Sequence, residues 1–128
     1  MANQLHGNVL LVEDDEVNQM VIKGLLILLG CNVSVASAGQ EALDMLTDPG
    51  ASYDVVIMDV GLPDMTGKQV TQKLRNSSCK LKSVPVIALT GQSATQDQKD
   101  CLESGMTSFI AKPTTKEILC NELKQILV

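Results

Sequence analysis

The sequence predicts an α/β domain built on one parallel sheet, because short apolar runs alternate with helical segments five times along its 128 residues. Each apolar run is about five residues long, which suits a buried strand and is too short for a helix. Strict alternation of strands and helices places helices on both faces of a parallel sheet. For five strands the common doubly wound order is 2-1-3-4-5, and we expect that order here.

The five strands are expected where aliphatic and β-branched residues cluster between turn residues. They are Asn8–Val12, Asn32–Ala36, Asp54–Asp59, Val84–Leu89 and Met106–Ala111. The third is the most informative, since Val55–Met58 is wholly apolar and runs directly into Asp59 before the chain turns at Gly61 and Pro63. One carboxylate is therefore expected at the carboxyl end of a buried strand, where open α/β sheets bind ligands.

The five helices are placed by capping residues, apolar spacing and terminating glycines. They are expected at Glu16–Leu29, Glu41–Leu46, Thr66–Arg75, Ala94–Glu103 and Thr114–Leu127. Asp15 is expected to cap the first helix, which ends at Gly30. A capping box pairs a hydroxyl residue with a glutamine or glutamate three residues later. Such boxes are expected at Ser37/Gln40, Thr66/Gln69 and Thr114/Glu117.

Composition indicates a single domain, with residues 1–7 as a polar tail or linker and residues 8–128 as the folded unit. Hydrophobic residues make up 45% of the chain and aromatic residues 2%, so we expect an aliphatic core. A net charge of −5 argues against a nucleic-acid surface and against contact with an anionic membrane. No apolar run approaches about 18 residues, and the start carries no secretory signal. Four scattered cysteines without metal-ligand spacing suit a reducing, cytoplasmic setting.

Charged and hydroxyl groups occur just where the predicted strands end. Glu13 and Asp14 follow the first strand, Asp59 closes the third, Thr90 follows the fourth and Lys112 follows the fifth. The second strand, which lies at the far edge in the expected order, ends in small residues. All five groups are therefore expected to converge at one edge of the sheet. Each alone would be an ordinary turn or cap residue, but their joint placement indicates a functional site.

Three carboxylates at close range repel one another, and a hard divalent cation relieves that repulsion. Oxygen ligands alone select Mg²⁺ or Mn²⁺, whereas Zn²⁺ prefers cysteine and histidine. Mg²⁺ commonly binds one or two carboxylates together with a phosphate oxygen. The site is therefore expected to hold Mg²⁺ and a phosphoryl group, with Lys112 and Thr90 contacting the phosphoryl oxygens. Asp59 is placed to act as the nucleophile and to form an acyl phosphate.

Four motifs together resemble the receiver, or response-regulator, domain of two-component signalling. They are Leu11–Asp14, Ile57–Pro63, Ala88–Gly91 and Phe109–Pro113. The resemblance covers residues 8–127 and implies the flavodoxin-like receiver fold. It also implies a domain that accepts a phosphoryl group from the phosphohistidine of a histidine kinase or histidine phosphotransfer domain, and that passes on or reports that state. Self-phosphorylation and autodephosphorylation are implied, without turnover of an external substrate.

The resemblance gives each acidic residue a role. It implies that Asp59 is the phosphoacceptor and also a metal ligand. Asp14 is then the direct Mg²⁺ ligand, and Glu13 acts mainly through water. Glu13 stands where the family more commonly has aspartate, which is an accepted variant. The backbone carbonyl of Gly61 is implied as a further ligand of the metal.

By the same resemblance, Lys112 binds the phosphate, Thr90 is the switch hydroxyl and Phe109 is the switch aromatic. Phe109 lacks the hydroxyl of the alternative tyrosine, so a switch there would work by rotamer and packing alone. The stretches Leu10–Gln19 and Leu62–Gly67 resemble receivers inside hybrid sensor histidine kinases, including the aerobic-respiration-control sensor type. This implies a domain excised from a larger sensor, with that parent anchored in the inner membrane.

Other classes are weighed against this one. A free-standing single-domain regulator is the main alternative to a hybrid-kinase origin. A haloacid-dehalogenase-like phosphatase also uses an aspartate nucleophile and Mg²⁺, but it needs a second acid two residues on, where this chain has Gly61. A flavodoxin-like cofactor carrier is disfavoured because the turn after the first strand is acidic and would repel a phosphate. A binding module that only looks like a receiver is disfavoured because all five site groups are present.

The first helix is apolar around much of its circumference, so its core face has to be inferred from the helical angle of about 100° per residue. One broad face is expected in the core and carries Val17, Met20, Val21, Leu25 and Leu28. Ile22 and Leu26 fall away from that face. They either widen the core stripe or form an exposed patch beside the site, where a helical bundle carrying the phosphohistidine would dock.

Overall fold

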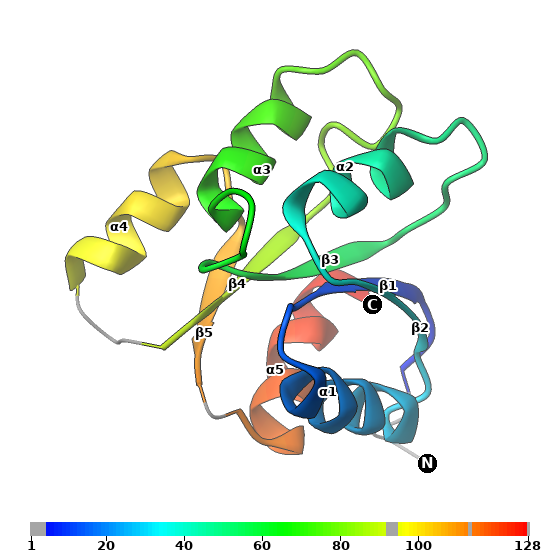
Figure 1. Cartoon of the computed structure of the whole chain (residues 1–128). Coiled ribbons are helices and arrows are strands. Elements are labelled where there is room, and N and C mark those ends of the chain that lie inside the picture. The colour runs from blue at the N-terminus through cyan, green and yellow to red at the C-terminus, as the bar shows by residue number, and fades with distance from the viewer. Residues whose placement is uncertain (1–4, 92–94, 113, 128) are drawn as a thin grey trace.

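Five parallel strands form a single sheet in the order β2-β1-β3-β4-β5, which confirms the predicted order (Figure 1). The computed structural model describes residues 5–91, 95–112 and 114–127. The strands are β1 Asn8–Val12, β2 Asn32–Ala36, β3 Val55–Asp59, β4 Val86–Thr90 and β5 Ser108–Ala111. The helices are α1 Glu16–Leu28, α2 Gly39–Thr47, α3 Gly67–Arg75, α4 Thr95–Glu103 and α5 Lys116–Leu127. Within the described residues, no helix is long and apolar enough to span a bilayer.

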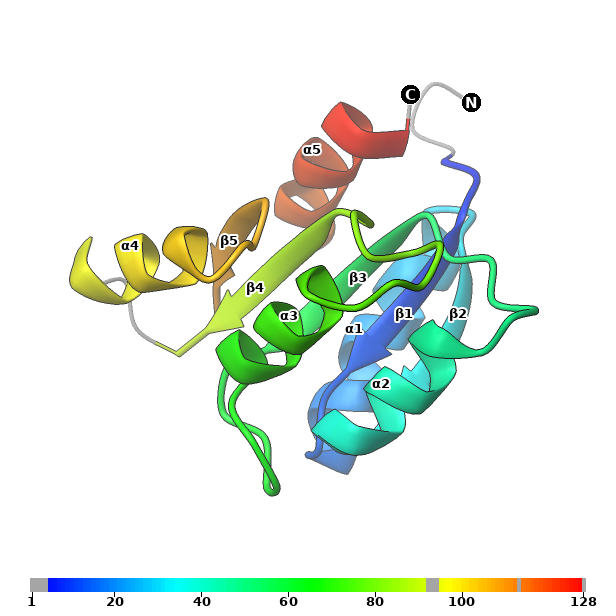
Figure 2. The ribbon, with the colours of Figure 1, turned by 90° about the horizontal axis from the view of Figure 1, so that it is seen from above.

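Helices cover both faces of the sheet. Figures 1 and 2 show α1 and α5 on one face and α2, α3 and α4 on the other. Alternate residues along the strands pack into two separate hydrophobic cores, one on each face of the sheet. In β1, Val9 and Leu11 pack with α1 and α5, whereas Leu10 and Val12 pack with α2 and α3. Because the central strands are buried on both faces, they read in the sequence as continuous apolar runs.

Three strands begin later than the sequence predicts, β3 by one residue and β4 and β5 by two. β4 begins at Val86 rather than at Val84, because Pro85 has no backbone N–H to donate to a strand ladder. β5 begins at Ser108 rather than at Met106, because the residues before it complete the turn after α4. The carboxyl ends of all three strands, which carry the polar groups, lie within one residue of the predicted position.

The predicted caps of α1 and α3 are confirmed. The Asp15 carboxylate accepts the Asn18 N–H at 2.9 Å. The box between Thr66 and Gln69 is complete, since the Thr66 hydroxyl accepts the Gln69 N–H at 3.1 Å and the Gln69 side chain accepts the Thr66 N–H at 2.9 Å. Both helices are capped by residues next to them in sequence, which is why the local pattern was sufficient.

At α5 the predicted box between Thr114 and Glu117 is wrong by one residue. The Thr115 hydroxyl accepts the Ile118 N–H at 3.2 Å, and the helix begins at Lys116. The Thr114 hydroxyl donates to the Thr115 carbonyl at 3.4 Å. With two threonines in tandem, the sequence alone does not decide which of them caps the helix.

α2 begins at Gly39, and the predicted box between Ser37 and Gln40 is not formed. The residue at the N-cap is Ala38, which has no side-chain oxygen. The Asp64 carboxylate, from the loop after β3, accepts the N–H of Gly39 at 2.8 Å and of Gln40 at 2.9 Å. The hydrogen bonds from Gln40 and Gly39 hold the pKa of Asp64 below its ordinary value. The helix is therefore capped from a distant loop.

Replacing Asp64 with Ala is expected to lower the thermal unfolding midpoint at neutral pH, because two N–H groups at the start of α2 lose their acceptor. The folded-state pKa is depressed, so the stabilisation is present above the unfolded-state pKa and is lost as the pH falls through the folded-state pKa. The midpoint difference between the native chain and the variant should therefore shrink on acidification. Thermal melts followed by circular dichroism at several pH values check this, and a difference that is constant with pH would contradict it.

α1 packs against the sheet through a different face from the predicted one. Ile22 and Leu26, expected as a possible exposed patch, are 5% and 0% exposed and lie in the core. Most of the residues expected in the core are outside: Val17 is 64%, Met20 70%, Val21 54% and Leu28 69% exposed. The prediction was wrong because apolar residues surround the helix, so that more than one face could serve as the core face.

The packed domain includes residues before β1. Leu5 is buried in the core beside α1, and its N–H donates to the Leu29 carbonyl at 2.6 Å. The Gly7 carbonyl accepts the Asn32 N–H at 2.9 Å. Residues 5–7, expected as part of a tail or linker, therefore contact the folded unit.

Candidate functional site

The carboxyl ends of β1, β3, β4 and β5 meet at one edge of the sheet. Parallel pairing keeps these ends level, with Asp59 opposite Leu89 and Thr90 opposite Ala111. A hollow of about 420 Å³ opens there, and we call it the site hollow. Its lining residues are Asp59, Val60, Gly61, Lys68, Thr90, Gly91, Cys101 and Lys112.

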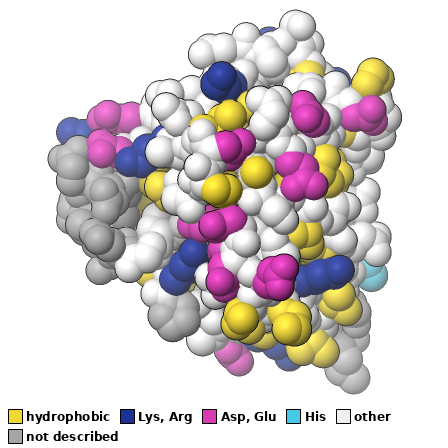
Figure 3. Space-filling view, in the orientation of Figure 1, with side chains coloured by type: hydrophobic (Ala, Val, Ile, Leu, Met, Phe, Trp, Pro, Cys, Tyr) yellow, Lys and Arg dark blue, Asp and Glu magenta, His cyan; other side chains and the backbone are white. Residues whose placement is uncertain are grey.

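Three carboxylates converge beside the site hollow, as the sequence predicts. Glu13, Asp14 and Asp59 each place one carboxylate oxygen within 4.8 Å of the others. Glu13 is 1% and Asp59 7% exposed, whereas Asp14 is open to solvent. Figure 3 shows acidic and basic side chains side by side on this face of the molecule. The arrangement leaves two buried acids and one accessible acid around a common point.

Lys112 is the cation closest to the two buried acids. Its Nζ lies 3.1 Å from Glu13 Oε1 and 3.1 Å from Asp59 Oδ1. Burial acts to lower the pKa of Lys112, but hydrogen bonds and charge from Asp59 and Glu13 outweigh it, and the pKa lies above its ordinary value. Lys112 is therefore a fixed positive charge at the mouth of the site.

The acids of the site carry more negative charge than Lys112 balances. Burial raises the pKa of Glu13, the N–H of Asp15 at 3.1 Å opposes that rise, and the charge of Asp59 adds to it. Glu13 Oε1 is buried, and its charge partner among the described residues is Lys112 Nζ at 3.1 Å. Three clustered carboxylates with one ammonium beside them form an all-oxygen donor set with excess negative charge, which suits a hard divalent cation such as Mg²⁺. The residues present therefore fit the predicted metal.

Glycines keep the rim of the site hollow open and let the start of α3 pack closely against the end of β3. A Cβ built on Gly61 or Gly91 would meet nothing within 4 Å, so both positions border free space. The Gly61 N–H also donates to Asp59 Oδ1 at 3.3 Å. At Gly67 a Cβ would stand 2.5 Å from the Asp59 carbonyl oxygen, so only glycine lets α3 start directly behind Asp59. This role of Gly67 was not predicted, because it depends on a contact across the fold.

Thr90 and Phe109 lie on the neighbouring strands β4 and β5. Thr90 is 5% exposed and lines the site hollow, and its carbonyl accepts the Lys112 N–H at 2.7 Å. Phe109 pairs with Ala88 across the ladder and packs against the core shared with α2 and α3. Thr90 therefore borders the site hollow directly, and Phe109 lies one strand further out.

Two further side chains contribute to the site without having been predicted. Gln19 of α1 donates to the Glu13 carbonyl at 2.5 Å and to the Ser37 hydroxyl at 3.0 Å, which braces the turn that carries the acids. Lys68, in the first turn of α3, lines the site hollow. Neither residue follows a strand, so the pattern of polar strand ends gave no signal for them.

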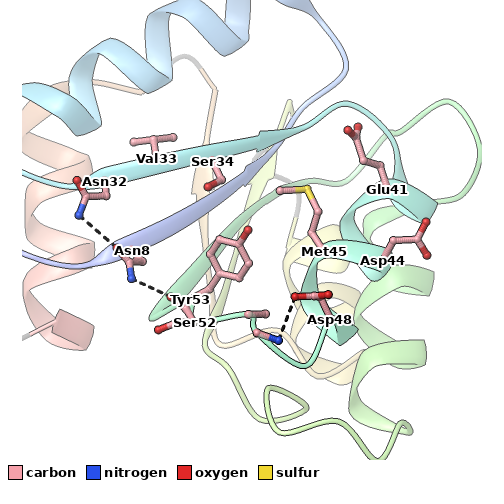
Figure 4. Close-up of a pocket in the computed structure, with 12 residues that line it drawn as sticks. Asn8, Asn32, Val33, Ser34, Glu41, Asp44, Met45, Asp48, Ser52 and Tyr53 are labelled. Carbon is pink, nitrogen blue, oxygen red and sulfur yellow. Dashed lines mark hydrogen bonds between the residues drawn. The ribbon is translucent and has the colours of Figure 1, made fainter.

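A larger hollow of about 580 Å³ lies elsewhere, beside β2 and α2 (Figure 4). Met45 and Tyr53 line it together with the acids Glu41, Asp44 and Asp48. Each of these carboxylates accepts a hydrogen bond from a neighbour in sequence. None of its lining residues is a lysine or arginine. This hollow therefore lacks the lysine that accompanies the acids at the carboxyl edge of the sheet.

A doubly wound five-stranded sheet with paired acids, a strand-end aspartate, a hydroxyl and a lysine at one edge defines a receiver domain. The family model of the response regulator receiver domain matches residues 9–124, and the chain belongs to that family. This confirms the predicted fold and class.

Curated relatives at 30% identity or more include hybrid sensor kinases. The chain is 39% identical to the osmosensing histidine protein kinase SLN1 of Saccharomyces cerevisiae, over 98% of this chain and 10% of that protein. It is 38% identical to the aerobic respiration control sensor protein ArcB of Escherichia coli, over 92% of this chain and 15% of that protein. The chain therefore spans only a small part of the length of these relatives.

Solved structures agree with the fold. The receiver domain of sensor histidine kinase PA1611 from Pseudomonas aeruginosa is 34% identical with a TM-score of 0.85, covering 95% of this chain and 98% of that one. That structure is described with a magnesium ion coordinated in the active site cleft. The chemotaxis protein CheY4 of Vibrio cholerae is 30% identical with a TM-score of 0.86, covering 95% and 99% of the two chains.

Proposed function

We propose that this receiver domain serves a phosphorelay by accepting a phosphoryl group on Asp59 in a Mg²⁺-dependent reaction. The observation that carries the proposal is the setting of Asp59. Its carboxylate closes a buried strand, contacts Lys112 at 3.1 Å and lies within 4.8 Å of acidic oxygens of Glu13 and Asp14. An open hollow in front of it leaves room for a phosphoryl group.

Asp59 supplies the nucleophile for the transfer. A carboxylate oxygen of Asp59 forms the new O–P bond while the P–N bond of a phosphohistidine breaks. The departing imidazole keeps the electrons of that bond and takes up a proton from water. Lys112 then pairs with a phosphoryl oxygen in place of Asp59 Oδ1, and the Thr90 hydroxyl hydrogen-bonds a second one. In this proposal the domain catalyses the transfer onto its own Asp59. Water later hydrolyses the acyl phosphate, which releases inorganic phosphate and restores the carboxylate, and no external substrate is turned over.

The acids of the site hold the metal in this proposal. Asp14 binds Mg²⁺ directly, Glu13 acts through water, and Asp59 and the Gly61 carbonyl complete the protein ligands. When bound, Mg²⁺ supplies positive charge to the phosphoryl oxygens. The clustered carboxylate oxygens of Glu13, Asp14 and Asp59 and the magnesium ion described in the PA1611 receiver support this set.

Removal of the metal is expected to abolish phosphorylation by a small donor. The native chain treated with acetyl phosphate and Mg²⁺ should gain the mass of one phosphoryl group, as measured by intact mass spectrometry. With excess chelator the gain should be absent, because the clustered carboxylates repel an incoming anion. Equal labelling with and without Mg²⁺ would contradict the proposed chemistry. No labelling in either case, with the fold intact, would favour a binding module that only looks like a receiver.

We further propose that Thr90 and Phe109 report phosphorylation to the surface formed by α4 and β5. Support comes from their adjacent strands, since Thr90 borders the site and Phe109 packs one strand away. Saturation with beryllofluoride, a mimic of the phosphoryl group, should shift the NMR signals of the Phe109 ring. Unchanged ring signals in the saturated protein would contradict this role.

The phosphodonor in this proposal is a phosphohistidine on a histidine kinase or histidine phosphotransfer domain, and the parent chain is a hybrid sensor kinase. The identities to SLN1 and ArcB support that origin. A free-standing regulator is the alternative, to which the likeness to CheY4 corresponds. A cytoplasmic location fits the four cysteines, all of which are free thiols.

The donor docks on the exposed face of α1 in this proposal, rather than on the buried Ile22 and Leu26. Figure 3 shows hydrophobic side chains gathered along the lower part of the molecule, where α1 lies. Val21 also lines a hollow of about 300 Å³ together with Lys112 and Gly91, so this face continues into the rim of the site. An apolar patch beside a reactive group is typical of a docking surface.

Replacing Met20 and Val21 together with Ser is expected to slow transfer from a phosphorylated histidine phosphotransfer domain by about tenfold or more, because apolar anchors are lost. The rate with acetyl phosphate should stay unchanged, since neither side chain contacts Asp59. Leu28→Ser is the matched control, an equally exposed change at the far end of the helix from the site. Equal slowing with both donors would contradict docking at this face.

A further inference from the structure

Lys68 places a second ammonium at the site hollow. It belongs to the first turn of α3, and two lysines, Lys68 and Lys112, are among the described residues that line the hollow with Asp59. The side chain of Lys68 is 27% exposed, so it is partly withdrawn from solvent. The proposed transfer chemistry makes no use of it.

The ion pair that Lys68 makes with Asp100 is long and partly exposed. Its Nζ lies 3.6 Å from Asp100 Oδ2 on α4, and the Asp100 side chain is 39% exposed. By contrast, Lys112 contacts both of its acids at 3.1 Å. A partly exposed ion pair at the longer distance is weak and can be exchanged for a stronger partner. The Lys68–Asp100 pair also links α3 to α4 at the edge of the site hollow.

Phosphorylation adds negative charge to the site hollow, and Lys112 alone does not neutralise it. Phosphorylation of Asp59 replaces one carboxylate charge with about two charges on the phosphoryl group, and it brings three strong acceptor oxygens into the hollow. Lys112 is already engaged by Glu13 and Asp59, so it cannot satisfy the added charge without giving up one of them. Lys68 lines the same hollow, and its weak pair with Asp100 makes it the cation most readily redirected.

We propose that Lys68 is a phosphoryl-binding residue that exchanges Asp100 for an oxygen of the phosphoryl group on Asp59. The exchange stabilises the phosphorylated state and at the same time releases the link between α3 and α4. This inference rests on the proposed function, because it takes Asp59 as the phosphoacceptor. Asp100 then disfavours the phosphorylated state, because it holds Lys68 away from the phosphoryl group.

The test measures the affinity of the whole chain for beryllofluoride in the presence of Mg²⁺, by titration calorimetry. Lys68→Met should weaken binding about tenfold or more, because a charge-assisted contact is lost. Lys68→Arg should restore most of it. Lys73→Met removes the same charge from an exposed position of the same helix and should change binding by less than about twofold. Circular dichroism confirms that each variant is folded.

Asp100→Asn separates this role from a merely structural one. If the pair only held α3 against α4, Lys68→Met and Asp100→Asn would change the affinity in the same direction. The proposal instead requires Asp100→Asn to tighten beryllofluoride binding while Lys68→Met weakens it. Equal affinities of Lys68→Met and Lys73→Met would overturn the inference and leave the proposed function standing. A native chain that binds no beryllofluoride would overturn both.

Discussion

Lys112→Met is expected to lower the rate of phosphorylation by acetyl phosphate by about 100- to 1,000-fold, the usual effect of removing one pre-positioned charge-stabilising donor. The ammonium lies 3.1 Å from Asp59 Oδ1 and from Glu13 Oε1, so the variant loses the cation that faces the phosphoryl oxygens. It also leaves two buried carboxylates without that partner, which raises repulsion toward an anionic donor. The initial rate of phosphoprotein formation at saturating Mg²⁺, followed by intact mass, measures the effect.

Lys116→Met is the control for this change, since it removes the same charge from an exposed position at the start of α5. The phosphorylation rate of Lys116→Met should stay within about twofold of the native rate, because salt screens the charge of an exposed side chain outside the site. Circular dichroism distinguishes a folded, slow Lys112→Met protein from an unfolded one. A folded variant with a rate near the native one would contradict the role given to Lys112.

Leu26→Ala is expected to reduce the free energy of unfolding by about 2–5 kcal/mol, as is typical for a fully buried leucine. Leu26 is 0% exposed and packs between α1 and the sheet with Ile22. Leu28→Ala, two residues further along and 69% exposed, should change the same quantity by less than about 0.5 kcal/mol. Urea unfolding of the two variants, with a common slope, measures the contrast.

Comparison of Leu26→Ala with Leu28→Ala tests which face of α1 packs on the sheet. A larger loss from Leu28→Ala than from Leu26→Ala would mean that the helix is rotated relative to the structure. That result would also return Ile22 and Leu26 to the surface and move the proposed docking face. The two substitutions are chemically identical, so their difference reports burial rather than helix propensity.

The strand order and five of the site groups could be predicted because their signals are local. A buried strand appears in the sequence as a short apolar run, and the polar residue at its carboxyl end directly follows that run. Once the parallel order is known, Glu13, Asp14, Asp59, Thr90 and Lys112 must meet at one edge. The charge chemistry of three acids and one lysine then leads to a divalent cation and a phosphoryl group.

The features that could not be predicted from the sequence depend on contacts between distant segments. α1 has apolar residues on several faces, so its helical period does not select Ile22 and Leu26 as the buried ones. The cap of α2 comes from Asp64, which lies 25 residues from Gly39. Lys68 joins the site only because α3 begins beside Asp59. In each case the deciding interaction has no counterpart in the neighbouring sequence.

The central claim is that Asp59 is the phosphoacceptor, and mapping the acyl phosphate tests it most directly. The chain is treated with acetyl phosphate and Mg²⁺ and then reduced with borohydride, which converts an aspartyl phosphate to homoserine. Peptide mass mapping should find homoserine at position 59 and none in the Asp59→Asn variant. Homoserine at another aspartate of the native chain, or undiminished phosphorylation of Asp59→Asn, would contradict the account.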